Sequence, residues 1–193
     1  HYSKEEVSKL QPEAPMDIAG AYWYESDAHS TPELFMKNLK AHLTTQGVEF
    51  VLEREVTSFQ KKGNHLIAVQ TDRGQFPADE FVVATGAWSE QLLKTLGVRL
   101  SVQAGKGYRL DLDQSTGIDL PAILLEAKVA VTPMEGFTRF GGTMEISGIN
   151  QKINAKRVAA IAKAANEYYS EVRIPQASID EVQSGLRPLS PDG

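Results

Sequence analysis

The chain has 193 residues and a formal net charge of −5, and 41% of its residues are hydrophobic. This length allows one large core or two small ones, and the lack of a basic excess disfavours nucleic-acid binding. No cysteine is present, which excludes disulfides, thiolate metal sites and a cysteine nucleophile. No signal peptide and no apolar run near the roughly 20 residues of a membrane span are found. We therefore expect a cytoplasmic protein, with association at the periphery of the inner membrane left open.

Two helices are predicted near the start of the chain. Ser3, with a glutamate three residues later, has the spacing of a capping box and predicts a short helix that runs to Leu10. Thr31 and Pro32 are residue types that favour a second helix start, and Gly47 is suited to its end.

Strands are predicted next. Val48–Leu52 is rich in apolar residues and predicts a strand. Val56–Phe59 and Leu66–Gln70 predict a β-hairpin that turns at Gly63-Asn64. The continuous apolar run Glu80–Ala84 is typical of a strand that is covered on both faces, as in a parallel sheet.

A glycine turn follows this last strand. Thr85 to Ser89 leads into a short helix that Ser89 can cap and that stops at Gly97. A strand, a glycine turn and a helix N-terminus together suit the binding of a cofactor. Because the chain contains no GxGxxG motif, an ordinary strand–helix connection remains an alternative.

The second half has a different pattern. Tyr108, Leu110 and Leu112 alternate with polar residues, as in a strand with one buried face. Asn154 predicts the start of a long amphipathic helix, and a last strand is expected at roughly Ser178–Gly185. Three further short strands are predicted over Ala122–Leu125, Val129–Thr132 and Phe137–Phe140. The expected fold class is therefore α+β, with two regions that meet near residue 98.

Arg187 is the most suggestive side chain near the end of the chain. Pro188 restricts it to extended backbone, so that its guanidinium could be held ready for a carboxylate or phosphate. The alternative is an exposed arginine in a turn. The four histidines do not have metal-ligand spacing, and no GxSxG motif is present. The residues themselves thus leave an anion contact of Arg187 and an exposed turn arginine as alternatives, and they predict no metal site.

Four stretches taken together resemble the FAD-dependent D-amino-acid oxidase superfamily (DAO family), and most of all its bacterial D-amino-acid dehydrogenase branch. They are GVEFVLEREVTSF, FVVATGAWSEQLLKTLGVRLSVQAGKGYRLDL, FTRFGGTMEISG and SGLRPLSPDG. The resemblance implies part of an FAD-binding domain of glutathione-reductase type and a substrate domain with an antiparallel sheet and flanking helices. It assigns residues 1–97 to the FAD region, 98–183 to the substrate region, and 184–193 to a strand returning toward the FAD region.

The resemblance also implies site residues. Arg187 matches the arginine that pairs with the substrate carboxylate. Tyr108 is a second candidate for substrate binding, although a buried sheet tyrosine is the alternative. The positions that match FAD contacts are Val56, Thr85, Gly86, Ala87 and Trp88. Ala130–Pro133 lacks the tyrosine that oxidases of this group often carry there, which favours the dehydrogenase branch.

The implied reaction is the oxidative deamination of D-amino acids to 2-oxo acids and ammonia, with hydride transfer to FAD. We expect the chain to be a central piece without the Gly-rich motif and the C-terminal end, and therefore to hold no FAD by itself. The expected partners are a small amino acid and an electron acceptor, which is a quinone, oxygen or a protein. The alternatives are a relative that oxidises glycine, sarcosine, a cyclic imino acid or a 2-hydroxy acid, and a non-catalytic module that binds small carboxylates.

Overall fold

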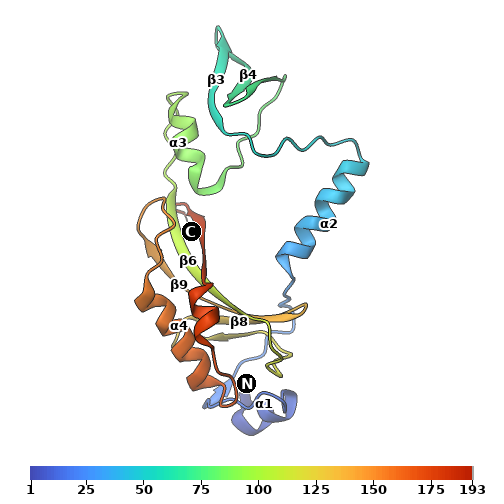
Figure 1. Cartoon of the computed structure of the whole chain (residues 1–193), viewed down its shortest axis with the longest axis vertical. Coiled ribbons are helices and arrows are strands. Elements are labelled where there is room, and N and C mark those ends of the chain that lie inside the picture. Colours follow the sequence, from blue (N-terminus) through green and yellow to red (C-terminus); the bar gives the residue numbers. More distant parts are fainter. Residues whose placement is uncertain (193) are drawn as a thin grey trace. The chain divides into compact units, whose positions relative to one another are not determined.

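The computed structural model describes residues 1–192 as a mixed chain of helices and antiparallel sheets (Figure 1). It separates into two compact units, each built from several segments. The first unit comprises His1–Met36, Lys106–Glu145 and Asn150–Gly185. The second comprises Lys37–Gly105, Ile146–Ile149 and Leu186–Gly193, of which Gly193 lies outside the described residues. The boundaries predicted at residues 97/98 and 183/184 stay predictions.

The first unit begins with two short paired strands and a helix. Strand β1 (Tyr2–Ser3) pairs with β2 (Gly20–Ala21), and helix α1 (Lys4–Leu10) starts directly after β1. Ser3 accepts a hydrogen bond from the Glu6 amide while the Glu6 carboxylate accepts one from the Ser3 amide. The predicted capping box and helix are therefore confirmed.

A five-stranded sheet forms the centre of the first unit, with the strand order β10-β6-β9-β8-β7. Its pairs β7–β8 and β8–β9 are antiparallel. A turn at residues 135–136 joins β8 to β9. The bounds are β6 (Gln103–Leu112), β7 (Ala122–Leu124), β8 (Val129–Met134), β9 (Phe137–Ile146) and β10 (Gln183–Leu189).

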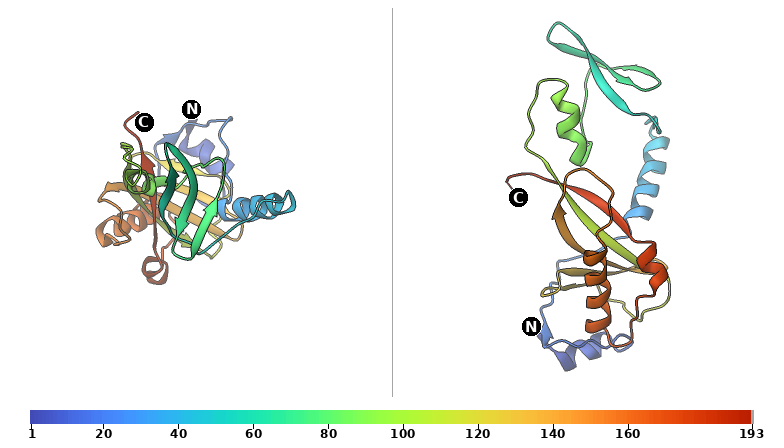
Figure 2. Two further views of the ribbon diagram at one scale, coloured as in Figure 1. Left: turned by 90° about the horizontal axis from the view of Figure 1, so that it is seen from above. Right: turned by 60° about the vertical axis from the view of Figure 1, so that its left-hand side comes forward.

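Helix α4 (Ala155–Tyr168) covers one face of this sheet (Figure 2). Its apolar stripe packs on the sheet, and Ile161 and Ala165 have no exposed surface. Leu110 and Phe140 meet it from β6 and β9, also fully buried. Full burial of each large apolar side chain stabilises the fold by about 1.5–3 kcal/mol. The predicted amphipathic helix is confirmed, and it fixes which face of the sheet is the core.

The second unit contains a smaller sheet and most of α2. Strand β3 (Val56–Lys62), β4 (His65–Thr71) and β5 (Gly74–Pro77) form an antiparallel meander, which confirms the predicted hairpin. Helix α2 (Pro32–Thr45) begins at the predicted proline and has no buried residue. A 3₁₀ turn, η1 (Gly86–Trp88), leads into α3 (Ser89–Lys94).

Two predicted strands are not formed. Val48–Leu52 and Glu80–Ala84 are both extended without strand pairing. A strand requires hydrogen bonds from a neighbour, and neither run has one among residues 1–192. Their apolar residues therefore remain accessible, with Leu52 60% and Val82 90% exposed.

The last predicted strand begins later than expected. Helix α5 (Gln176–Asp180) occupies the start of the range predicted as a strand, and β10 runs from Gln183 to Leu189. Pro175 holds the N-cap position of α5 and suits a helix start. The strand prediction is wrong for residues 178–182 and correct for residues 183–185. No helix among residues 1–192 is long and apolar enough to cross a membrane.

Candidate functional site

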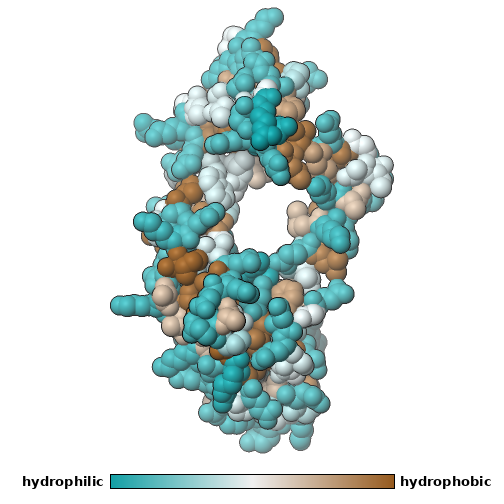
Figure 3. Space-filling model, in the orientation of Figure 1, coloured by the Kyte–Doolittle hydropathy of each residue, from teal (hydrophilic) through white to brown (hydrophobic). Residues whose placement is uncertain are grey.

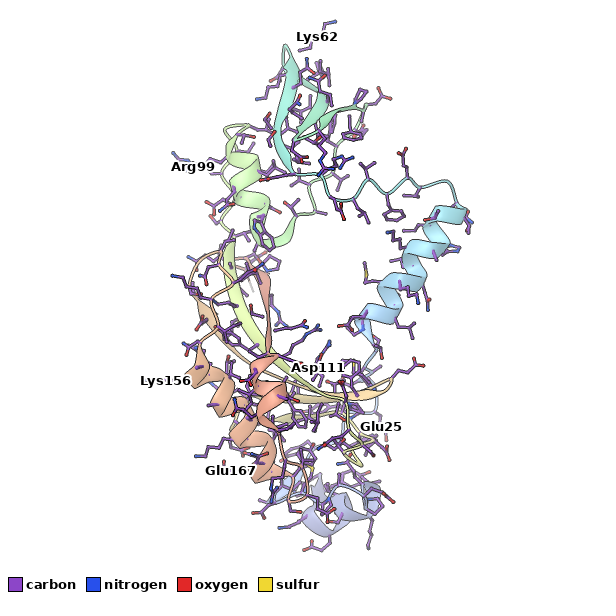
Figure 4. All side chains as sticks on the ribbon, viewed as in Figure 1. Glu25, Lys62, Arg99, Asp111, Lys156 and Glu167 are labelled. Carbon is purple, nitrogen blue, oxygen red and sulfur yellow. The ribbon has the colours of Figure 1, made fainter. Side chains whose placement is uncertain are left out.

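The two faces of β6 carry different kinds of side chain. Tyr108 and Leu110 are buried on the face that α4 covers, and Lys106 shares that face. Arg109 and Asp111 alternate with them and therefore lie on the opposite face. Figure 4 shows Asp111 on the side of the sheet turned away from α4. We call that side the open face, because α4 packs on the other side of the sheet.

Lys106 is a charged group inside the core-facing side of the sheet, with only 1% of its surface exposed. Its ammonium donates to Asn150 Oδ1 at 2.6 Å and to the Lys152 carbonyl at 2.8 Å, and it lies 3.2 Å from Glu145 Oε1. A buried ammonium is tolerated only when it is paired and hydrogen-bonded. Lys106 therefore fastens the segment after β9 to the sheet.

Glu145 is the carboxylate at the centre of this cluster. It accepts a hydrogen bond from the Tyr108 hydroxyl at 2.8 Å and pairs with Arg157 at 2.8 Å. The hydrogen bond from Tyr108, followed by those from Lys106 and Asn154, lowers the pKa of Glu145 to about 2. Burial, followed by the contact with Glu145, raises the pKa of Tyr108. Both groups therefore keep their protonation states across the neutral range.

An irregularity in β9 brings Glu145 to this position. Regular alternation would place Glu145 on the same face as Arg139, yet it contacts residues of the opposite face. Thr143 lies between them with a φ of 61°, which is rare for a β-branched residue, and its buried hydroxyl has no partner among the described residues. This left-handed residue shifts the alternation by one, as a β-bulge does. Met144, 52% exposed, is correspondingly not buried under α4.

The preceding glycine, Gly142, lies in close contact with neighbouring elements. A Cβ on Gly142 would lie 3.1 Å from Ile161 Cγ1, 3.1 Å from Val129 Cγ2 and 3.2 Å from the Lys128 carbonyl oxygen. Glycine is the one residue that lets β9 pack this tightly against α4 and β8.

A second polar cluster lies on the open face. Arg139 binds Asp111 through two hydrogen bonds of 2.8 Å, one from Nε and one from a terminal nitrogen. Arg109 donates to Gln183 Oε1 and to Glu33 Oε1, the latter at 2.6 Å. Arg139 also donates to Glu33 Oε1, at 2.9 Å. Two guanidinium groups from neighbouring strands thus meet at one carboxylate oxygen.

Glu33 comes from the first turn of α2, and its side chain is 50% exposed. Its hydrogen bonds from Arg109 and then Arg139 lower the pKa of Glu33 to about 2. The hydrogen bonds that Arg139 donates to Asp111, followed by the one it donates to Glu33, raise the pKa of Arg139. Glu33 is therefore ionised at neutral pH. The cluster of Arg109, Arg139, Asp111 and Glu33 pairs two guanidinium groups with two carboxylates and has no formal net charge.

Arg187 lies on β10, the strand next to β6 at one edge of the sheet. Side-chain exposure alternates from Gln183 to Arg187, so these two residues project from the same face of the strand. Arg187 is exposed and makes no ion pair within residues 1–192. Its guanidinium is thus available to an anion.

The predicted cofactor-contacting residues lie in the second unit. Thr85 to Trp88 form the turn before α3, and the Thr85 and Ser89 hydroxyl oxygens lie 3.1 Å apart. Ser89, predicted as the cap, is instead the first residue of α3. Gly86 has a φ of 56° with no atom within 4 Å of where a Cβ would lie.

Ala87 is buried, Trp88 is 47% exposed, and Val56 begins β3 opposite Thr71. The open space beside the half-buried Gly86 and the accessible indole are features that fit contact with a flat, polar cofactor such as FAD. The predicted roles of these residues, like those of Arg187 and Tyr108, remain predictions. Among residues 1–192, no group of histidine and acidic side chains is arranged to hold a metal ion.

Sequence reasoning missed both polar clusters, because each combines residues that are far apart in the chain. Lys106 gave the one available signal: it occupies a position that alternation assigns to the buried face, together with Tyr108 and Leu110. A lysine on the buried side of a strand predicts a buried partner of opposite charge.

Comparison with known proteins agrees with the resemblance seen in the sequence. D-amino acid dehydrogenase of Neisseria meningitidis is 33% identical over 97% of this chain and 46% of its own length. D-amino acid dehydrogenase of Vibrio vulnificus is 31% identical over 91% of this chain and 42% of its own length. The chain thus spans a little under half the length of these relatives.

Solved structures with the same fold include glycine oxidase from Geobacillus kaustophilus. The match to that structure has a TM-score of 0.83 at 20% identity, and it covers 100% of this chain and 51% of the glycine oxidase chain. L-proline dehydrogenase from P. horikoshii has a TM-score of 0.75 at 16% identity and covers 98% of this chain and 52% of its own. The predicted α+β class with antiparallel sheets is confirmed. The pattern of the DAO family, described as FAD dependent oxidoreductase, matches residues 1–193, and the chain belongs to this family.

Proposed function

We propose that the chain is part of an FAD-dependent enzyme that oxidises D-amino acids to 2-oxo acids and ammonia. The observation that carries this proposal is the match of the whole chain to the DAO family, together with relatives named D-amino acid dehydrogenase at more than 30% identity. The free guanidinium of Arg187 supports it, since an amino-acid substrate has a carboxylate that needs a partner.

Arg187 orients the substrate in this proposal. Pro188 follows it, so the backbone of Arg187 is confined to extended conformations and its side chain leaves a defined position on β10. A guanidinium that binds a carboxylate through two parallel hydrogen bonds fixes the direction of the Cα–H bond. FAD, when bound, supplies the redox chemistry by accepting the hydride. Thr85 to Trp88 and Val56 contact it in this scheme.

The unpaired extended runs support a larger FAD-binding region. Val48–Leu52 and Glu80–Ala84 carry apolar side chains on backbone without ladder partners. Buried backbone N–H and C=O groups need hydrogen-bond partners, and an apolar strand needs other elements packed on its faces. We propose that both runs are strands of a parallel sheet in the full-length protein. Figure 3 shows apolar surface (brown) in this part of the chain.

Replacement of Arg187 by alanine tests the proposal in the full-length protein. In the variant, kcat/KM for D-alanine should fall by a factor that corresponds to about 2–5 kcal/mol, because one member of a charge pair with the substrate is removed. Most of this fall should come from a higher KM. Arg99→Ala is the matched control, because Arg99 is also an exposed arginine of the second unit. Near-normal kcat/KM in Arg187→Ala would exclude the proposed role.

The same assay with other substrates separates the alternatives. Turnover of glycine, sarcosine, cyclic imino acids or 2-hydroxy acids in preference to D-alanine would assign the protein to another activity of the family. Flavin reoxidation with oxygen, with a soluble quinone and with membranes identifies the electron acceptor and any peripheral association at the inner membrane.

A further inference from the structure

The open-face cluster has a geometry that a simple surface ion pair does not need. Each of its two arginines has an anchor of its own: Asp111 holds Arg139 through two bonds, and Gln183 holds Arg109. One terminal nitrogen of each arginine also donates to a single oxygen, Glu33 Oε1. Two positioned guanidinium donors around one oxygen are a carboxylate-binding arrangement.

Glu33 is the least firmly held member of this cluster. Its side chain is half exposed, whereas those of Arg139 and Arg109 are 13% and 32% exposed. The helix that carries it has no buried residue to hold its first turn in place. An exposed ion pair contributes little net free energy, so another carboxylate can replace Glu33 at small cost.

The net charge of the cluster also supports replacement of Glu33 by another carboxylate. With Glu33 in place, two arginines face two carboxylates. When Glu33 moves away, Asp111 remains the one carboxylate against two guanidinium groups, and the position then carries one net positive charge. It is therefore suited to an incoming anion once Glu33 leaves.

We propose that Arg109 and Arg139 form a carboxylate-binding position for the acidic side chain of a substrate, and that Glu33 occupies it in the absence of that substrate. This inference rests on the proposed function and extends it, because it names dicarboxylic D-amino acids such as D-glutamate as a preferred class. The open face carries the position, on the side of the sheet opposite α4 (Figure 4).

Binding of glutarate to the full-length protein tests the position without any turnover. Calorimetric titration should detect glutarate, and Arg139→Met should weaken its binding roughly tenfold to a hundredfold, as expected for losing a hydrogen bond to a charged group. Glu33→Gln should tighten it, because the internal competitor loses its charge. Arg73→Met, which removes an exposed arginine of the second unit, should leave it unchanged. Absence of glutarate binding, or equal binding in Arg139→Met, would overturn the inference.

Turnover separates this inference from the proposed function. The ratio of kcat/KM for D-glutamate to that for D-alanine should fall in Arg139→Met and rise in Glu33→Gln. An unchanged ratio together with lower thermal stability would show that the cluster only holds α2, and would refute the carboxylate position. If D-alanine and D-glutamate are both inert while glutarate binds as expected, the proposed function fails and the anion position stands.

Discussion

At the scale of single residues, Lys106 shows how a buried charge can hold a chain together. It lies almost wholly inside the first unit and connects β6 to Glu145 near the end of β9, and to Asn150 and the Lys152 carbonyl in the segment before α4. Its methylene groups pack in the core while its ammonium finds three oxygen partners. Loss of one member should therefore destabilise the cluster, because the remaining buried polar groups lose the opposite charge and the hydrogen bonds that offset their burial.

Lys106→Met should destabilise the full-length protein by about 3 kcal/mol, since Glu145 and the buried oxygens around it lose a cation that apolar atoms cannot replace. Chemical unfolding followed by tryptophan fluorescence measures the change. Lys163→Met on α4 is the control: Lys163 is 72% exposed and pairs with Glu167, so its loss should cost less than about 1 kcal/mol. Equal effects of the two substitutions would refute the structural role of Lys106.

The pKa of Glu145 gives a second prediction at this scale. Its folded-state pKa is lowered from the ordinary value of 4.5 to about 2 by its hydrogen bonds. A carboxyl group with a lowered pKa stabilises the fold above its unfolded value, and that contribution disappears as the pH falls from about 4.5 toward 2. Glu145→Gln should therefore flatten the dependence of stability on pH in this acidic window. Thermal melts of both proteins from neutral to acidic pH measure it, and parallel curves would contradict it.

At the scale of elements, the starts of α1, α2 and α4 were predictable, whereas α5 and several strands were not. Caps and prolines act within a few residues, so Ser3 and Pro32 marked helix starts that the structure confirms. A strand depends on a neighbour that local sequence does not reveal. Val48–Leu52 and Glu80–Ala84 have strand composition, but no partner is present among residues 1–192. The two polar clusters were unpredictable for the same reason, because their members meet only through the sheet.

The contact between β9 and α4 yields a prediction for these elements. Gly142→Ala should destabilise the protein by about 1–3 kcal/mol, because the added methyl group meets Ile161, Val129 and a backbone oxygen that cannot move freely. The neighbouring Gly141→Ala is the matched control. Its Cβ would meet only the Tyr108 carbonyl oxygen, at 3.9 Å, which is an ordinary contact. Equal unfolding midpoints for the two variants would show that the tight packing is not a constraint.

At the scale of the whole molecule, composition excluded some classes of protein, and membership of the family is the basis of the proposed function. The absence of cysteine and the net negative charge excluded several classes of protein, but they did not indicate a flavin. The ordered set of four sequence stretches did so, and the family match over residues 1–193 confirms the family. The chain spans a little under half the length of its named relatives, so activity belongs to the full-length protein and has to be measured there.

The most direct test of the central claim is the reduction of flavin by substrate in the full-length protein. Under anaerobic conditions, D-alanine or D-glutamate should bleach the visible flavin absorbance in the wild type, and the rate at low substrate should drop sharply in Arg187→Ala. L-alanine should leave the spectrum unchanged. A purified protein that contains flavin but is bleached by neither D-amino acid would contradict the account.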